Sequence, residues 1–186
     1  LDLKEASQKS ANVIQTTKFH YEGQNEFPPK KSNLLYDCEA FVEKEGNFYL
    51  FTKNRSKGFD GTFLVFQIPN KEGDFEAKLV AKIKLEDSYN DAAITSATIN
   101  SKNQIVLLTH KNVHLVSSFF ENNFTGSFIQ KISLNHNSQK EAVVFLDDRS
   151  LLIADEKDKK EGGNVYSILG MISHINDFPQ DLKGKR

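Results

Sequence analysis

Three segments of the chain align with one another without a gap, and this internal repeat constrains the fold more than any other feature of the sequence. The segments span residues 39–53, 96–110 and 141–155. Each has alanine at its second position and leucine near its end, followed by another apolar residue and then by Thr or Ala. They begin about 57 and then about 45 residues apart, close to the ~40–50 residues of one β-propeller blade.

Short strands separated by turns are predicted along the whole chain. Runs of β-branched, aliphatic and aromatic residues alternate with clusters of Gly, Asn, Asp, Lys and Ser, which is the pattern of strands and turns. No long stretch has the apolar period of a helix, although residues 1–12 could form a helical turn or two. We expect strands at 14–21, 39–42, 47–52, 62–68, 78–85, 94–99, 104–109, 113–117, 128–134, 141–146, 150–154 and 164–168.

The repeat favours an all-β fold of the β-propeller type. Inner strands of a propeller crowd around a central channel, where alanine fits, and Ala40, Ala97 and Ala142 share one position of the repeat. A β-sandwich with coincidental similarity between its segments is the alternative. A propeller closes with about 4–8 blades, whereas this chain has about three and a leading strand. We expect the missing blades to come from residues upstream of Leu1, which makes the chain a fragment, or else from a partner chain.

The repeat also gives expected boundaries. Residues 13–168 form the propeller part, preceded by a lead-in at 1–12 and followed by a C-terminal tail at 169–186. Within the propeller part we expect the outer strand of a preceding blade and its linker at 13–36, and three blades at 37–86, 87–135 and 136–168.

A family resemblance rests on three stretches in this order and spacing. They are DCEAF at 37–41 with NFYLFTK at 47–53, ITSATI at 94–99 with IVLLT at 105–109, and EAVVF at 141–145 with IADE at 153–156 and VYSI at 165–168. Over about residues 13–168, the chain resembles the C-terminal two-thirds of six-bladed β-propeller proteins of Bacteroidetes-type bacteria, which are exported or lipid-anchored and have no assigned activity. The third stretch is also distantly similar to propellers of the phytase-like and esterase-like group.

This resemblance implies a location and a missing part. It implies a protein that is periplasmic, associated with the outer membrane or secreted, with about two further blades before Leu1 and a lipid anchor upstream of this chain. The sequence itself has no apolar run near the ~20 residues that span a bilayer. Its 24 basic and 25 acidic residues are well mixed, so no basic surface for nucleic acid is expected.

Ligands of propellers usually meet the mouth of the central channel, so acidic residues near the inner strands are the site candidates. Glu39 and Glu141 share one position of the repeat and could together hold a hard cation such as Ca²⁺, which takes about six to eight oxygen ligands. In the alternative interpretation, each carboxylate accepts backbone N–H bonds from a neighbouring blade and locks the ring. The ligand or channel-mouth candidates are Asp37, Glu39, Glu141, Asp155 and Glu156.

The histidines and the single cysteine are not expected to carry chemistry. Lys111-Asn112 reads as a hairpin turn that would place His110 and His114 on alternate faces, so they would not chelate a metal. Cys38 lies beside Glu39 in an inner strand, where burial keeps a thiol inert. The other histidines stand alone and are expected to be surface or packing residues: His20, His136 and His174.

Two functions of different classes fit the sequence. No Gly-x-Ser-x-Gly elbow, phosphate-cradling glycine loop or His-Glu-x-x-His motif is present, and no catalytic residue is predicted. The favoured hypothesis is a non-catalytic binding or scaffolding propeller that acts outside the cytoplasm on a partner not identified by sequence. The other hypothesis is a calcium-dependent phytase-like or esterase-like hydrolase with its site at the central channel.

Overall fold

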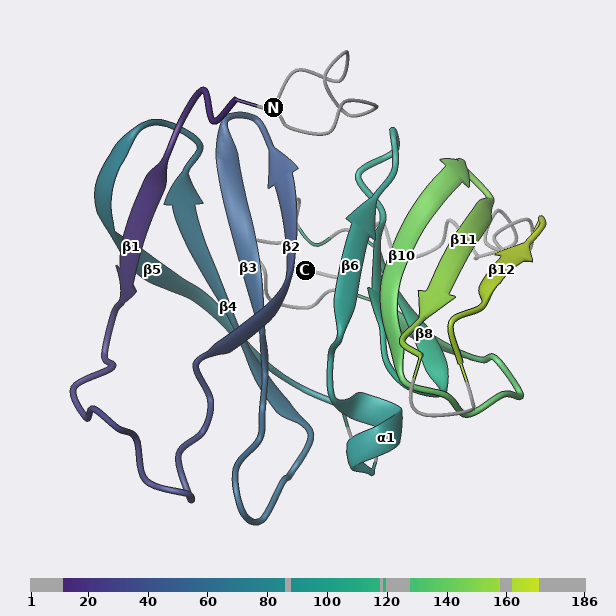
Figure 1. Cartoon of the computed structure of the whole chain (residues 1–186), viewed down its shortest axis with the longest axis horizontal. Coiled ribbons are helices and arrows are strands. Elements are labelled where there is room, and N and C mark those ends of the chain that lie inside the picture. The colour runs from purple at the N-terminus through teal and green to yellow at the C-terminus, as the bar shows by residue number, and fades with distance from the viewer. Residues whose placement is uncertain (1–11, 86–87, 118, 120–127, 158–161, 171–186) are drawn as a thin grey trace, which may run out of the picture.

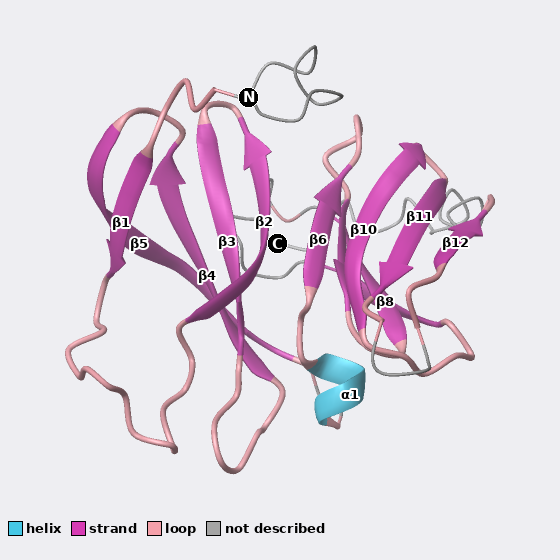
Figure 2. Ribbon diagram, in the orientation of Figure 1, coloured by secondary structure: helices cyan, strands magenta, loops and turns pink. Residues whose placement is uncertain are grey.

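The structure, a computed structural model, describes residues 12–85, 88–117, 119, 128–157 and 162–170. These residues form an all-β molecule with one short helix (Figures 1 and 2). The elements are β1 Thr17–Tyr21, β2 Asp37–Lys44, β3 Asn47–Lys53, β4 Thr62–Pro69, β5 Gly73–Lys84, α1 Tyr89–Ala92, β6 Ser96–Ile99, β7 Ile105–Leu108, β8 Asn112–Ser117, β9 Phe128–Ser133, β10 Lys140–Asp147, β11 Ser150–Asp155 and β12 Val165–Ile168.

The strands form three sheets that follow one another along the chain. The first has the order β1-β5-β4-β3-β2, the second β6-β7-β8-β9 and the third β10-β11-β12. Neighbours within each sheet are antiparallel, except that β1 pairs with β5 in parallel. Each sheet is therefore a meander in which consecutive strands are neighbours, and β1 is added at the outer edge of the first one.

The first strands of the three meanders lie side by side. β2 contacts β6, and β6 contacts β10. All three run in the same direction, and the starts of β2 and β10 lie at the end of the molecule that carries α1 (Figure 1). We call this end the α1 end. Because β3 and β11 run antiparallel to β2 and β10, the α1 end also receives the ends of β3 and β11.

Two layers of the apolar core lie between neighbouring sheets, and a third cluster, which includes Leu50 and Phe66, lies on the other face of the first sheet. Phe51 and Phe63 of the first sheet pack with Leu107 of the second, and the ring of Phe119 lies 6.1 Å from that of Phe51, centroid to centroid. A second layer joins the second sheet to the third. Burying one such side chain contributes about 1.5–3 kcal/mol, so these layers hold the sheets face to face.

On the second strand of each hairpin, the facing of the repeat positions is kept in the first two sheets and shifted in the third. Phe51 faces the second sheet and Leu108, at the same repeat position, faces the third. Ile153 also has this position, but it faces back toward the second sheet. Ala142 pairs with Ala154 and is exposed, whereas Ala40 is buried. Ala97 pairs with Leu107 and faces back toward the first sheet, so it differs from Ala40 as well. Bulges and turn lengths differ between the hairpins, and the prediction of one crowded alanine position in every inner strand is therefore wrong.

All twelve predicted strands correspond to strands of the structure, with ends that differ by a few residues. The largest differences are the start of β1, which begins at Thr17, and the start of β5, which begins at Gly73. Helix α1 was not predicted. The helical turns considered for residues 1–12 and nearly all of the tail at 169–186 lie outside the described residues.

Candidate functional site

A network of opposite charges joins β2 and β3 at the α1 end. Lys53, at the end of β3, is 4% exposed, and its Nζ lies 2.6 Å from Oε2 of Glu39 on β2. Arg55 follows β3 and forms ion pairs with both Asp37 and Glu39. The hydrogen bond to Asp37 is the main cause that raises the pKa of Arg55 above its usual value. Both predicted carboxylates of the first sheet are thus already bound by cations of that same sheet.

Glu141 differs from its repeat partner Glu39. Its carboxylate, on β10, is half-buried and has no hydrogen bond or ion pair among the described residues. Burial is the main cause that raises its pKa; Lys53 opposes this rise, and the charges of Glu39 and Glu156 add to it. The structure therefore brings Glu39 and Glu141 to the same end, as their repeat position predicts, but in unlike surroundings.

The arrangement does not resemble a calcium centre. Within the described part of the chain, no group of three or more His, Cys, Asp or Glu side chains is placed to hold a metal ion. Glu39 shares its oxygens with Lys53 and Arg55, whose positive charges disfavour a cation beside them. Ca²⁺ takes about six to eight oxygen ligands, and Glu39 and Glu141 together have four carboxylate oxygens.

Asp155 fixes the connection between β11 and β12. It is buried, and it accepts hydrogen bonds from the backbone N–H of Asn164 at 2.7 Å and from the Tyr166 hydroxyl at 2.8 Å. Burial alone would raise the pKa of Asp155, but these two bonds, with help from Ser138 and Lys140, lower it to about 2. Asp155 is therefore a charged structural anchor rather than a proton donor at neutral pH.

Lys140 fixes the facing connection, between β9 and β10. Its side chain is buried, and its ammonium group donates to the carbonyl oxygens of His110 and His136, each at 3.0 Å. It also contacts Ser138 Oγ at 2.9 Å and His136 Nδ1 at 3.3 Å. Burial lowers the pKa of Lys140, and the nearby charge of Asp155 opposes that decrease. This one lysine ties the β9–β10 connection to the β7–β8 turn.

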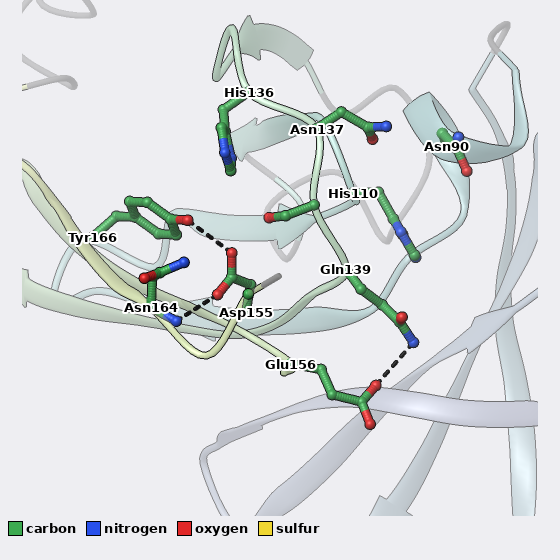
Figure 3. Close-up of a pocket in the computed structure, with 11 residues that line it drawn as sticks. Asn90, His110, His136, Asn137, Gln139, Asp155, Glu156, Asn164 and Tyr166 are labelled. Carbon is green, nitrogen blue, oxygen red and sulfur yellow. Dashed lines mark hydrogen bonds between the residues drawn. The ribbon is translucent and has the colours of Figure 1, made fainter. Parts of the chain in front are cut away.

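Between these two anchored connections lies an open pocket of about 550 Å³ (Figure 3). Rings of His136 and Tyr166 flank it, with centroids 5.3 Å apart and planes at 51°. On the opposite side, Gln139 Nε2 donates to Glu156 at 2.8 Å. The lining residues are Asn90, His110, His136, Asn137, Ser138, Gln139, Asp155, Glu156, Gly162, Asn164 and Tyr166.

The turn between β7 and β8, near His110 and His114, differs from the predicted one. Thr109 pairs with Asn112 through a 2.9 Å backbone bond, so the turn residues are His110-Lys111 and the predicted register was wrong by one. His114 lies within β8, where its Nε2 contacts the carbonyl oxygen of Asp91 at 2.9 Å. Nε2 of His110 is buried and has no hydrogen-bond partner among the described residues. Burial, followed by the charges of Lys53 and Lys140, lowers the pKa of His110.

Cys38 lies on β2 and is half-buried. Its Sγ lies 3.6 Å from the carbonyl oxygen of Ala40, and burial raises the pKa of the thiol. A raised pKa leaves less thiolate at neutral pH, which agrees with the expectation that this thiol is inert.

All five predicted site residues lie at the α1 end, but their partners differ from those expected. Glu39 is bound by side chains of its own hairpin, and the carboxylate of Glu141 has no hydrogen bond among the described residues, whereas the alternative hypothesis had both accept backbone N–H bonds from a neighbouring blade. Four features of this end were not predicted from the sequence: Arg55, Lys140, Gln139 and the His136–Tyr166 ring pair. Arg55 had a signal in the sequence, because Asp37-x-Glu39 lies across the hairpin from Lys53-x-Arg55.

No protein-family model matches the chain, and no curated protein matches it significantly. The class of protein that fold and site define is therefore an all-β protein with a polar pocket at one end of its sheets. Helix α1, with four residues, is too short to cross a membrane, and the described residues hold no helix that could.

Proposed function

We propose that this chain is part of a β-propeller and serves as a non-catalytic binding or scaffolding protein outside the cytoplasm, with its partner at the α1 end. The observation that carries the proposal is the contact of β2, β6 and β10, the first strands of three consecutive meanders, which run side by side in one direction. First strands around a common axis, with later strands farther out, are the arrangement of propeller blades.

The outward face of the third sheet supports further blades. Val144, Leu146 and Val165 are 49%, 52% and 65% exposed on strands whose opposite side packs against the second sheet. A closed ring needs at least about four blades. We therefore propose that a further four-stranded sheet of the same protein covers this face, within a ring of six blades as the resemblance implies.

Binding is favoured over hydrolysis because most of the carboxylates at the α1 end are engaged by cations and hydrogen-bond donors of the protein itself. Asp37, Glu39 and Asp155 are each held by hydrogen bonds or ion pairs. Groups fixed in this way give a rigid surface of mixed sign, which suits recognition by complementary charges. A calcium-dependent hydrolase would need carboxylates converging on one ion, and no observation favours that arrangement. The location outside the cytoplasm rests on the family resemblance alone.

Charge reversal at either end of the molecule tests the proposal. Glu156 is exposed at the α1 end, whereas Glu72 is exposed in the β4–β5 turn at the other end of the sheets. The immobilised wild-type chain, Glu156→Arg and Glu72→Arg would each be incubated with envelope and secreted fractions of the source cells. We expect one defined protein to be retained by wild type and Glu72→Arg but lost from Glu156→Arg. Equal retention by both variants, or calcium-dependent hydrolysis of phosphate or carboxylate esters, would contradict the proposal.

A further inference from the structure

The pocket between the β9–β10 and β11–β12 connections is preformed, because hydrogen bonds within the protein hold both connections. One wall, at 136–139, is held by the buried ammonium group of Lys140, and the facing wall, at 164–166, is held by the buried carboxylate of Asp155. Each anchor makes at least two charge-assisted hydrogen bonds, which are stronger than neutral ones. Since the walls are already ordered, a ligand would not have to supply the free energy of ordering them.

The described lining of this pocket is polar. Amide side chains are the commonest kind among these residues, and none of them has an aliphatic side chain: Asn90, Asn137, Gln139 and Asn164 are joined by Ser138 and by the rings of His110, His136 and Tyr166. An amide both donates and accepts hydrogen bonds, and so does a hydroxyl group. A ligand with many hydroxyl groups can therefore both donate hydrogen bonds to this lining and accept them from it, whereas an apolar ligand would leave polar groups unpaired.

Charged ligands fit the pocket less well. The only charged side chains that line its described part are Asp155 and Glu156, both negative, so an anion such as phosphate meets repulsion. The ammonium group of Lys140 lies behind the wall and is engaged by acceptors on His110, His136 and Ser138. A divalent cation would have to displace the donors that already hold the two carboxylates.

The rings of His136 and Tyr166 give the pocket an aromatic surface. His136 is exposed and Tyr166 partly exposed, and their rings line the same side of the pocket (Figure 3). The face of an aromatic ring carries partial negative charge, which attracts the C–H groups on one face of a sugar ring. The Tyr166 hydroxyl is fixed by Asp155, so the orientation of the phenol ring is set in advance.

We infer that this pocket binds a neutral, hydroxyl-rich ligand, a sugar residue, with amide side chains at its hydroxyl groups and the His136–Tyr166 pair against its C–H face. The inference rests on the proposed binding function of the α1 end and names the ligand class for one part of that surface.

Amide NMR of the ¹⁵N-labelled full chain tests this inference. The probes are glucose, galactose, mannose, N-acetylglucosamine and their common disaccharides, each raised to about 10 mM, since single-sugar affinities near the millimolar range are weak but measurable. Inorganic phosphate and calcium chloride are the comparison probes. We expect saturable shifts from at least one sugar at the amides of 136–139 and 162–166, and no such shifts from phosphate or calcium.

Two variants in the pocket and one outside it complete the test. His136→Ala removes a ring, and Asn137→Ala removes an exposed amide that has no hydrogen bond within the described part of the chain. Each should weaken sugar binding about tenfold. Asn25→Ala, an exposed residue of the β1–β2 connection, should leave affinity unchanged, and dispersed amide spectra would show that all three variants fold.

Three results would overturn the ligand class: shifts at these amides from phosphate or calcium but from no sugar, sugar shifts that fall elsewhere, or no binding of any probe. None of them would contradict the proposed binding function, which is judged separately by retention of a protein on wild type and its loss from Glu156→Arg.

Discussion

At the scale of single residues, the ion pairs of the α1 end are the strongest constraint on what this surface can do. Lys53 is almost fully buried, and Glu39 lies against it at 2.6 Å with a side chain that is 20% exposed. A buried charge whose partner is removed destabilises a fold far more than the pair itself stabilises it. Glu39 therefore stabilises the fold by neutralising the buried charge of Lys53.

Glu39→Gln should lower the free energy of unfolding by about 2–4 kcal/mol, because it leaves the Lys53 ammonium group buried without its counter-charge. Denaturant unfolding of the variant measures this loss. The double variant Glu39→Gln with Lys53→Met should recover most of it, since no charge is then left buried. An equal effect with calcium present and absent is expected; a loss of stability seen only in the calcium-loaded protein would show instead that Glu39 is a metal ligand.

Glu141→Gln should act in the opposite direction and depend on pH. Burial raises the pKa of Glu141 in the folded chain above its unfolded value, so the fold prefers the protonated form. This preference stabilises the fold at acid pH and is lost as the pH rises through the folded pKa. At pH 7 the variant should melt higher than wild type by at most about 2 °C, because solvent screens a half-buried group.

Melting temperatures from about pH 3 to pH 8 check the Glu141 prediction, since this range brackets a carboxylate titration. The difference should vanish at the acid end of the range. Glu72→Gln, at an exposed position, serves as the control and should show no such trend. A Glu141→Gln variant that melts lower than wild type at pH 7 would mean that the charged carboxylate has a partner.

How much of the site the sequence could predict also depends on single residues. The acidic candidates could be placed at one end of the sheets, because in an antiparallel hairpin the start of the first strand lies beside the end of the second. These candidates are Asp37, Glu39, Glu141, Asp155 and Glu156. The pocket could not be predicted, because it depends on how Lys140 folds the β9–β10 connection over the β7–β8 turn. Nothing in the local sequence marks a lysine that will be buried rather than exposed.

At the scale of elements, strands were predictable and their exact pairing was not. Apolar runs bounded by turn residues identify strands, but the register of each hairpin depends on its turn. The buried side chain of Asn112 donates to Oδ1 of Asp91 in α1 at 3.0 Å, and this contact accompanies the turn at His110-Lys111. Helix α1 has only four residues, too few to be stable without such tertiary contacts, so its sequence carries no helical signal.

The connection between β3 and β4 makes an element-scale prediction. Gly61 has a φ of +80°, and a Cβ there would lie 1.6 Å from the carbonyl oxygen of Leu85, just after β5. Gly61→Ala should therefore lower the free energy of unfolding by about 3 kcal/mol or more, because the backbones must separate. Gly46→Ala is the matched control, since Gly46 has a φ of +75° but no atom near the added Cβ.

The control variant Gly46→Ala should cost only about 1 kcal/mol, the price of the left-handed conformation alone. Thermal or denaturant unfolding of both variants gives the comparison. Similar losses for the two glycines would mean that the end of β5 does not approach Gly61 as closely as the structure has it.

At the scale of the whole molecule, the sequence predicted an all-β chain of successive sheets, and the structure has them. The repeat predicted neighbouring first strands, and β2, β6 and β10 are neighbours. It could not predict which way each repeat position faces, since the β2–β3 and β10–β11 pairings have bulges at different places and the β6–β7 pairing has none. Closure into a ring stays a proposal, because it concerns surfaces that these three sheets leave open.

The most direct test of the central claim is an experimental structure of the native polypeptide, by crystallography or electron cryomicroscopy. We expect a closed ring in which β2, β6 and β10 are inner strands of consecutive blades. We also expect a further four-stranded sheet packed on Val144 and Val165. A structure in which the three sheets complete the fold, with that face in solvent and no common axis lined by first strands, would contradict the propeller proposal.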